Sequence, residues 1–167
     1  MYGYQEDVAS SGSNSTRKFG LNTRVKMTEF KWIPNAGKGG AEAEALEIKF
    51  NVDGGEYSYR QFPVTKAFGK DNQEITDPNS EEMKAEFERF NQVIVHLVSC
   101  FVPHETIRTA MANPIADFKQ YCEILTSILP ANFADIQINA FFQYQWALKG
   151  DAKQTYLELP KNLKHGK

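Results

Sequence analysis

The stretch ALEIKFNVDGGEYSYRQFPV, residues 45–64, predicts two strands joined by a tight turn. In its first half, apolar residues recur at every second position, at Leu46, Ile48, Phe50 and Val52. Such alternation is typical of a strand with one buried face. The Asp-Gly-Gly sequence at 53–55 supplies residues that tolerate the positive φ angles of hairpin turns. An antiparallel hairpin is therefore expected here.

The length of this turn decides where two tyrosines of the returning strand point. With a two-residue loop, Tyr57 and Tyr59 lie on the face of Phe50. With a three-residue loop, they lie on the face of Lys49 and Asn51. The sequence leaves both registers open.

A preceding strand is predicted in RVKMTEFKWI, residues 24–33, from its β-branched and aromatic content. Two apolar residues in its first half are out of phase with Phe30 and Trp32 in its second half. A bulge near Glu29, or a long strand that serves two faces, accounts for this switch. Either arrangement gives three consecutive strands in the first part of the chain.

A closing pair of strands is predicted near the C-terminal end of the sequence. Apolar residues occupy every second position there: Ile136, Ile138, Ala140, Phe142, Tyr144, Trp146 and Leu148. The alternate positions are mostly polar, and the aromatic Phe141 stands out among them. One face is thus expected to be buried and the other exposed to solvent. A turn around Gly150 leads into QTYLELP, the last predicted strand.

Helical periodicity fills the middle of the chain, from about residue 78 to residue 130. Asp77 or Ser80 can cap a helix that begins near Glu81. Apolar residues then recur at three- and four-residue steps and predict a buried stripe: Met83, Phe87, Phe90, Ile94, Leu97, Val98 and Phe101. Two further helices are predicted between prolines: Pro103, Pro114 and Pro130.

Charge is distributed unevenly along the chain. Residues 1–70 carry 10 Lys/Arg and 8 Asp/Glu, residues 71–135 carry 4 and 11, and residues 136–167 carry 5 and 2. The predicted strands are thus net basic and the predicted helices net acidic, although the whole chain has a net charge of -2. This polarity favours an anionic ligand on the strand side of the molecule.

The residue pattern indicates neither catalysis nor metal binding. Three histidines and the lack of a Ser-His-Asp or Cys-His spacing leave little capacity for acid–base chemistry. His96 and Cys100 stand one helical turn apart, but with Cys122 they still lack a fourth ligand, which favours core cysteines. The loop at 37–40 (Gly-Lys-Gly-Gly) can approach a phosphate but lacks the spacing of a nucleotide-hydrolysing loop. We expect a protein without enzymatic activity or cofactor.

Phe141 is the best candidate for a binding residue, because it is an aromatic on the polar phase of its strand. A ring exposed between amide side chains can stack on nucleobases; alternatively, the helical insert or a second copy of the chain covers it. The other candidates are strand aromatics, which elsewhere are more often core residues, and their basic neighbours. They are Lys26, Lys31, Trp32, Lys49, Tyr57, Tyr59, Arg60 and Lys149.

Together these elements predict a mainly β, α+β fold: an OB-like five-stranded Greek-key barrel with helices between its third and fourth strands. Residues 1–20, rich in Ser, Gly and Asn, predict a flexible arm. A single domain is expected over residues 21–160, followed by a basic tail at 161–167. No apolar run approaches the roughly 20 residues of a membrane span. Because neither a signal peptide nor a transit peptide is visible, a cytoplasmic protein is expected.

Two stretches, EALEIKFNVDGGEYSYRQFPVTKAFGK and FFQYQWALKGDAKQTYLELPKNLKHGK, resemble the single-stranded DNA-binding proteins of tailed bacteriophages. These are OB-fold replication proteins in which long helical insertions occur. The resemblance implies a protein that coats the displaced strand during phage replication or recombination in the host cytoplasm. Many such proteins recruit replication partners through an acidic tail, whereas this sequence finishes with KNLKHGK. The acidic helical insert is then the candidate surface for replication proteins.

The sequence thus predicts sequence-independent binding of single-stranded DNA, with Lys and Arg neutralising phosphates and aromatic rings stacking on bases. The alternative is a non-enzymatic interaction subunit of a phage or bacterial assembly, which buries the same aromatics in a protein interface. Neither interpretation fixes the oligomeric state, so a homo-oligomer stays open, as does the preference between DNA and RNA.

Overall fold

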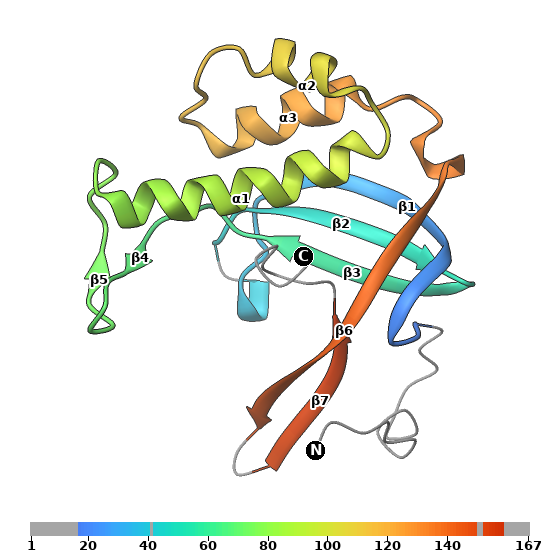
Figure 1. Ribbon diagram of the computed structural model, residues 1–167, viewed down its shortest axis with the longest axis horizontal. Coiled ribbons are helices and arrows are strands. Elements are labelled where there is room, and N and C mark those ends of the chain that lie inside the picture. The colour runs from blue at the N-terminus through green and yellow to red at the C-terminus, as the bar shows by residue number, and fades with distance from the viewer. Residues whose placement is uncertain (1–16, 41, 150–151, 159–167) are drawn as a thin grey trace.

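A computed structural model describes residues 17–40, 42–149 and 152–158, with the side chains of the closing hairpin described up to Phe142. In these residues the largest element is a five-stranded antiparallel sheet in the order β3-β2-β1-β6-β7 (Figure 1). Its strands are β1 (Gly20–Ile33), β2 (Ala45–Val52), β3 (Gly55–Gln61), β6 (Gln137–Lys149) and β7 (Ala152–Glu158). Between β3 and β6, where every residue is described, the chain forms two short strands and three α-helices: β4 (Ala67–Phe68), β5 (Glu74–Ile75), α1 (Glu81–Ser99), α2 (His104–Ala110) and α3 (Phe118–Ile128). The fold is therefore α+β, as the sequence predicts.

β1 lies at the centre of the sheet and pairs with β2 on one side and with β6 on the other. A turn joins β2 to β3, whereas β6 follows the helices and lies beside β1. This is the spatial order of a Greek key, in which the fourth strand comes back next to the first. β3 and β7 are the two edges, so the sheet stays open in the described residues. The closed barrel expected from the strand order is not seen there.

The helices cover one face of the sheet, and the hydrophobic core lies between the two layers (Figure 1). Both layers contribute its largest fully buried side chains: Phe50, Phe142, Met27, Leu46, Ile48, Ile94, Leu125, Val25, Val52, Val98 and Cys122. Burying one large apolar side chain stabilises a fold by about 1.5–3 kcal/mol. The core therefore holds the helical insert against this face of the sheet.

The hairpin between β2 and β3 has a two-residue loop. Asp53 and Gly54 adopt positive φ angles of 50° and 92°, which suit the right-handed twist of the flanking strands. Tyr57 and Tyr59 consequently lie on the face of Phe50, toward the helices. Of the two registers that the sequence leaves open, the protein has the one that points both tyrosines toward the core.

β1 changes its phase at a bulge between Met27 and Glu29. The bulge inserts one extra residue into the strand, so apolar residues on both sides of it face the core. The sequence allowed either a bulge near Glu29 or a strand that serves two faces, and the bulge is confirmed.

β1 begins at Gly20, earlier than the predicted start at Arg24, because its first residues pair with β6. A second irregularity lies between Asn22 and Val25, where the pairing register with β6 shifts. The end of the predicted arm is therefore part of the sheet. Residues 1–16 of that arm, like the predicted basic tail, lie outside the described residues.

The three helices confirm the predicted proline-bounded pattern. Ser80 caps α1, and its hydroxyl oxygen accepts a hydrogen bond from the backbone N–H of Met83 at 3.2 Å. Two expectations were wrong in detail. Phe87, predicted in the buried stripe, is 41% exposed because it borders a pocket. Cys100, predicted in an apolar pattern, is exposed at the C-terminal end of α1.

The alternation in β6 leads to opposite predictions for two adjacent phenylalanines. Phe142 is fully buried, whereas Phe141 is 51% exposed. Phe142→Ala is expected to lower the free energy of unfolding by about 3–5 kcal/mol, through lost burial and a new cavity. Phe141→Ala should change it by about 0.5 kcal/mol or less. Urea unfolding followed by circular dichroism measures both, and equal losses would contradict the placement of Phe141 on the solvent side.

Candidate nucleic-acid interface on the open face of the sheet

In the described residues the face of the sheet opposite the α-helices carries no α-helix, although the β1–β2 loop with its short 3-10 turn at Lys38–Gly40 lies on that side (Figure 1). We call it the open face. Residues that pair across antiparallel strands point to the same side, so the register defines its members. They are Leu21, Lys26, Glu29, Lys31, Glu47, Lys49, Asn51, Glu56, Ser58, Arg60, Gln137, Asn139 and Phe141. The open face thus brings together these binding residues predicted from the sequence: Lys26, Lys31, Lys49, Arg60 and Phe141.

Three large apolar side chains meet where β1 and β6 pair, and we call them the aromatic patch: Phe19, Leu21 and Phe141. They are 59%, 63% and 51% exposed, respectively. The rings of Phe19 and Phe141 meet edge to face, with centroids 6.1 Å apart, and Leu21 pairs directly with Phe141. Exposed apolar side chains that gather in one place, rather than scatter singly, mark a binding surface.

A polar recess of about 280 Å³ lies on the same strands, lined by Arg24, Lys26, Asn51, Asp53, Gly54 and Gln137. The side chain of Gln137 is fixed there, because its amide nitrogen donates to the carbonyl oxygen of Thr23 at 2.7 Å. Arg24 forms an exposed ion pair with Asp53 at 3.4 Å. In the described part of the chain no ion pair involves Lys26, so its ammonium can meet an anion at little cost.

The polar recess and the aromatic patch follow each other along β6. Gln137 and Phe141 are both on the open face and are four residues apart, which corresponds to about 14 Å at the rise of a strand. Asn139 stands between them and is exposed. One short extended polymer can therefore contact a cation, an amide and an exposed ring in sequence.

The remaining cations of the open face are neutralised by carboxylates of neighbouring strands. Glu29 accepts from Lys31 and lies 3.6 Å from the ammonium of Lys49. The hydrogen bond from Lys31 holds the pKa of Glu29 below its usual range, and Glu29 raises the pKa of Lys31. Arg60 contacts the largely buried carboxylate of Glu47 through two nitrogens, at 3.0 and 2.9 Å. These three cations are thus less available to phosphates than the sequence suggested.

The loop between β1 and β2 reaches the same part of the open face. The guanidinium of Arg60 also donates to the backbone carbonyl of Ala36 at 3.3 Å, which ties the loop to β3. Ala36 itself is buried and donates its N–H to the carbonyl of Ala43 at 2.7 Å. We call the part of the open face around Lys31, Lys49 and Arg60 its upper half, and this half is an ion-paired structural surface. The lower half is the part that holds the recess and the aromatic patch.

Three predicted binding residues lie on the helix side instead of the open face. Tyr57 is 3% exposed and its ring packs against those of Phe50 and Phe142. Tyr59 donates its hydroxyl hydrogen to the side-chain oxygen of Gln61 at 2.7 Å. The two-residue turn is the physical reason, because it puts both tyrosines in phase with the core.

Trp32 is the third of these residues, and it also faces the helices. Its indole N–H donates to the carboxylate of Glu44 at 2.8 Å. The ammonium of Lys119 on α3 lies 4.8 Å from the centroid of its ring. Trp32 therefore joins the β1–β2 loop to α3 and is not available as a stacking platform. Lys149 ends β6 and pairs with Ala152, but its side chain lies outside the described part.

Sequence reasoning missed Phe19, Leu21 and Arg24 as site residues. Phe19 and Leu21 fell in or next to the predicted arm, because the strand was expected to begin at Arg24. The alternation of Phe19, Leu21 and Thr23 with smaller or polar neighbours was the available signal for an earlier start.

Comparison of the chain with protein-family models, curated proteins and solved structures finds no match. The described residues contain no cluster of three His, Cys, Asp or Glu side chains arranged to hold a metal ion. Burial raises the pKa of the Cys122 thiol to about 12, so this cysteine is an unreactive core residue. None of the described helices has the length and apolar content needed to cross a bilayer.

The Glu47–Arg60 and Glu29–Lys31 ion pairs are expected to contribute differently to the stability of the fold. Arg60→Ala removes both hydrogen bonds to the nearly buried Glu47 and is expected to lower the free energy of unfolding by about 1–2 kcal/mol. Lys31→Ala removes a half-exposed partner of Glu29 and should cost about 0.5 kcal/mol or less. Urea unfolding of both variants tests this. Equal effects would mean that the Glu47–Arg60 pair is no more structural than an ordinary surface pair.

Proposed function

We propose that the protein binds single-stranded DNA without sequence preference, along the lower half of the open face. The observation that carries the proposal is the aromatic patch, which exposes Phe19 and Phe141 on the same strands as the cationic recess of Arg24 and Lys26. Proteins that bind single strands combine such rings with a positively charged groove.

Phe141 is the central stacking residue in this proposal. Phe19 supports its ring from the side, and the edge-to-face contact leaves part of each ring exposed. A base stacked on an aromatic ring contributes about 1–3 kcal/mol, and every base has a flat face that can stack. The lack of sequence preference follows from this chemistry.

Lys26 neutralises a phosphate that passes the recess, and Arg24 adds to this when its exposed ion pair with Asp53 opens. The ion pairs of Lys31, Lys49 and Arg60 limit the contribution of the upper half, because each of these cations already faces a carboxylate. If these cations moved to bind phosphates, the carboxylates of Glu29 and Glu47 would lose their ion-pair partners. We therefore expect the affinity for DNA to fall with salt concentration. The decrease should be shallower than if Arg24, Lys26, Lys31, Lys49 and Arg60 were all free of ion pairs.

The fold supports the proposal through its strand order. A five-stranded Greek-key arrangement whose first strand pairs with both the second and the fourth is compatible with an OB-type barrel opened between β3 and β7. We propose that the chain is a member of this class with a helical insert. Coating of a displaced strand during phage replication or recombination is the role that the sequence resemblance implies for it.

The test is fluorescence anisotropy of a labelled oligo-dT strand, with a duplex of equal length as control. Phe141→Ala is expected to weaken binding roughly 5- to 150-fold, the equivalent of one lost stacking contact. Phe68→Ala is the matched control, because Phe68 is also exposed, at 56%, but lies on β4 outside the open face.

Lys26→Ala should reduce the slope of log affinity against log salt by about 0.7, the loss of one phosphate contact on a single strand. Lys84→Ala on α1, whose ammonium is paired with Glu81, should leave the slope unchanged. Binding to the duplex as tight as to the single strand would refute the proposal. So would equal effects of Phe141→Ala and Phe68→Ala.

A further inference from the structure

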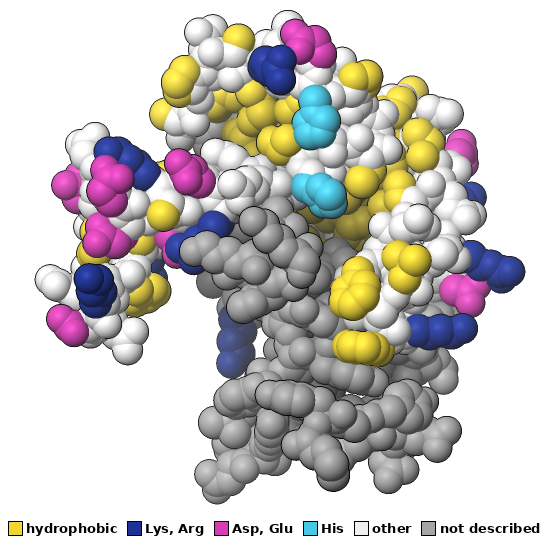
Figure 2. Space-filling model, viewed as in Figure 1, with side chains coloured by type: hydrophobic (Ala, Val, Ile, Leu, Met, Phe, Trp, Pro, Cys, Tyr) yellow, Lys and Arg dark blue, Asp and Glu magenta, His cyan; other side chains and the backbone are white. Residues whose placement is uncertain are grey.

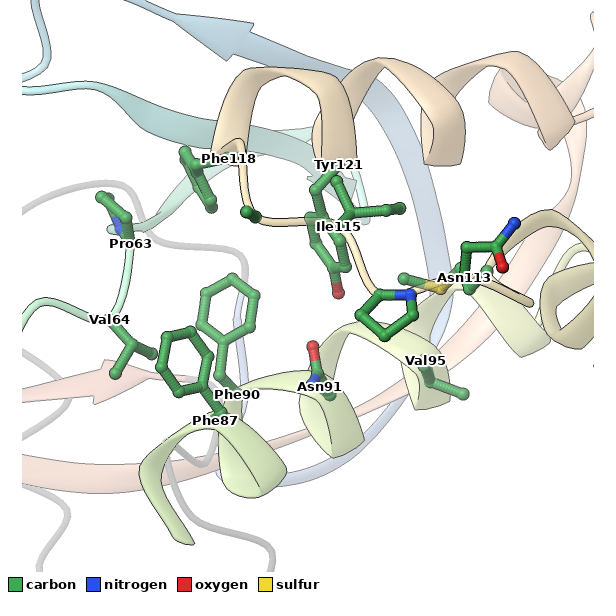
Figure 3. A pocket seen from close by; sticks show the side chains of 13 residues that line it. Pro63, Val64, Phe87, Phe90, Asn91, Val95, Asn113, Ile115, Phe118 and Tyr121 are labelled. Atoms are coloured by element: carbon green, nitrogen blue, oxygen red, sulfur yellow. The ribbon is translucent and has the colours of Figure 1, made fainter. Parts of the chain in front are cut away.

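A pocket of about 450 Å³ opens on the helical side of the molecule (Figure 3). It lies between α1 and the segment of residues 111–121, with residues 63–64 at one end. Four aromatic side chains line it: Phe87, Phe90, Phe118 and Tyr121. Figure 2 shows hydrophobic side chains exposed between α1 and the layer of α2 and α3. The volume falls within the roughly 300–1,000 Å³ of protein pockets that bind ligands.

The hydroxyl group of Tyr121 is buried at the wall of this pocket. Tyr121 is 7% exposed, and its hydroxyl forms no hydrogen bond with any described residue. Figure 3 shows it directed from α3 toward the side of α1 that carries Asn91 and Phe90. Leaving a buried hydroxyl unpaired destabilises the folded protein. An acceptor atom brought in by a ligand would relieve that destabilisation.

The charges around the pocket are acidic. Glu88 follows Phe87 on α1 and is exposed, and Asp117 stands exposed between two lining residues at the start of α3. The cations closest in sequence are already engaged: Arg89 with Glu86, Lys84 with Glu81, and Lys119 with Glu123 and the ring of Trp32. Residues 71–135 as a whole carry 4 Lys/Arg and 11 Asp/Glu. This surface attracts a cationic partner and repels nucleic acid.

We propose that the pocket binds a basic, amphipathic peptide segment of a partner protein. Large apolar side chains of the segment fill the space between Phe87 and Phe118. The Tyr121 side chain turns toward the segment and donates a hydrogen bond to one of its backbone carbonyls, and the lysines or arginines of the segment meet Glu88 and Asp117. Apolar anchors in a groove with charged residues at the rim are the usual anatomy of peptide recognition.

This inference does not rest on DNA binding. The pocket and the aromatic patch share no residue, so the two sites can be tested and can fail separately. A peptide bound at the helical side leaves the open face accessible. The protein would then hold a strand on one side and a basic partner on the other.

The test uses the full chain and three labelled synthetic peptides of equal length. The first has lysines and leucines at amphipathic helical spacing, the second replaces each lysine with glutamate, and the third replaces each leucine with alanine. Fluorescence anisotropy should show binding of the lysine–leucine peptide at least tenfold tighter than either of the others. A lysine–leucine peptide that fails to bind at millimolar protein overturns the proposal.

Variants then locate the binding. Phe87→Ala should weaken binding of the lysine–leucine peptide about tenfold or more, as expected for a lost apolar anchor. Phe68→Ala, an exposed phenylalanine outside the pocket, should leave it unchanged. Equal effects of the two substitutions would overturn the proposal, because the peptide would then bind through general charge attraction.

Tyr121→Phe separates binding from folding. It should weaken peptide binding about 2- to 10-fold, the effect of one hydrogen bond, while the thermal midpoint of the free protein stays the same or rises. A lower midpoint with unchanged peptide affinity would show that the hydroxyl is structural and contradict its assigned role. Displacement of the peptide by oligo-dT would assign the pocket to nucleic acid instead.

Discussion

The pairing of β1 with two neighbours is the constraint on which the rest of the molecule depends. β1 is 14 residues long: its N-terminal part, residues 20–26, pairs with β6, and its C-terminal part, residues 25–33, pairs with β2. β6 comes from a part of the chain that lies beyond the whole helical insert. The insert must therefore fold so that its two ends meet the same sheet, and burial of its apolar stripe against one face achieves this.

The two irregularities in β1 decide what the open face presents. The bulge between Met27 and Glu29 keeps the apolar residues on both sides of it, Met27 and Phe30, on the core side. The register shift between Asn22 and Val25 brings Leu21 onto the same side as Lys26. Without these local changes, regular alternation along β1 would point the core residues of one half of the strand to the opposite face of the sheet. The aromatic patch and the recess are on one face because β1 is not regular.

The separation of charge between the layers gives each side of the molecule its own chemistry. On the open face, carboxylates neutralise most of the cations, and the exposed rings and the recess are the groups that we propose to contact the strand. On the helical side, an acidic surface surrounds an apolar pocket with an unpaired hydroxyl. A net charge close to zero thus conceals two surfaces of different character. We propose that the first binds an anionic strand and the second a cationic peptide.

Much of the fold follows from the sequence, because its signals are local. The alternation at 45–52, the Asp-Gly turn and the proline-bounded helices each report on a short stretch. Phe141 was recognised for the same reason, as an aromatic on a polar phase. Ion pairing across strands is not local: the contact of Glu47 with Arg60 needs the register. The face on which Tyr57 lies depends on the length of the turn, which the sequence did not fix. The burial of the Tyr121 hydroxyl depends on how α1 packs near α3, which the sequence also did not show.

The central claim is that single-stranded DNA contacts the lower half of the open face. Photocrosslinking of an oligonucleotide that carries 5-bromodeoxyuridine, followed by mass-spectrometric mapping, tests this most directly, because it identifies the residues that touch the bases. The account predicts crosslinks at Phe141 and Phe19 and none within α1, α2 or α3. Crosslinks confined to the helices, at Phe87 or Phe118 for example, would contradict it.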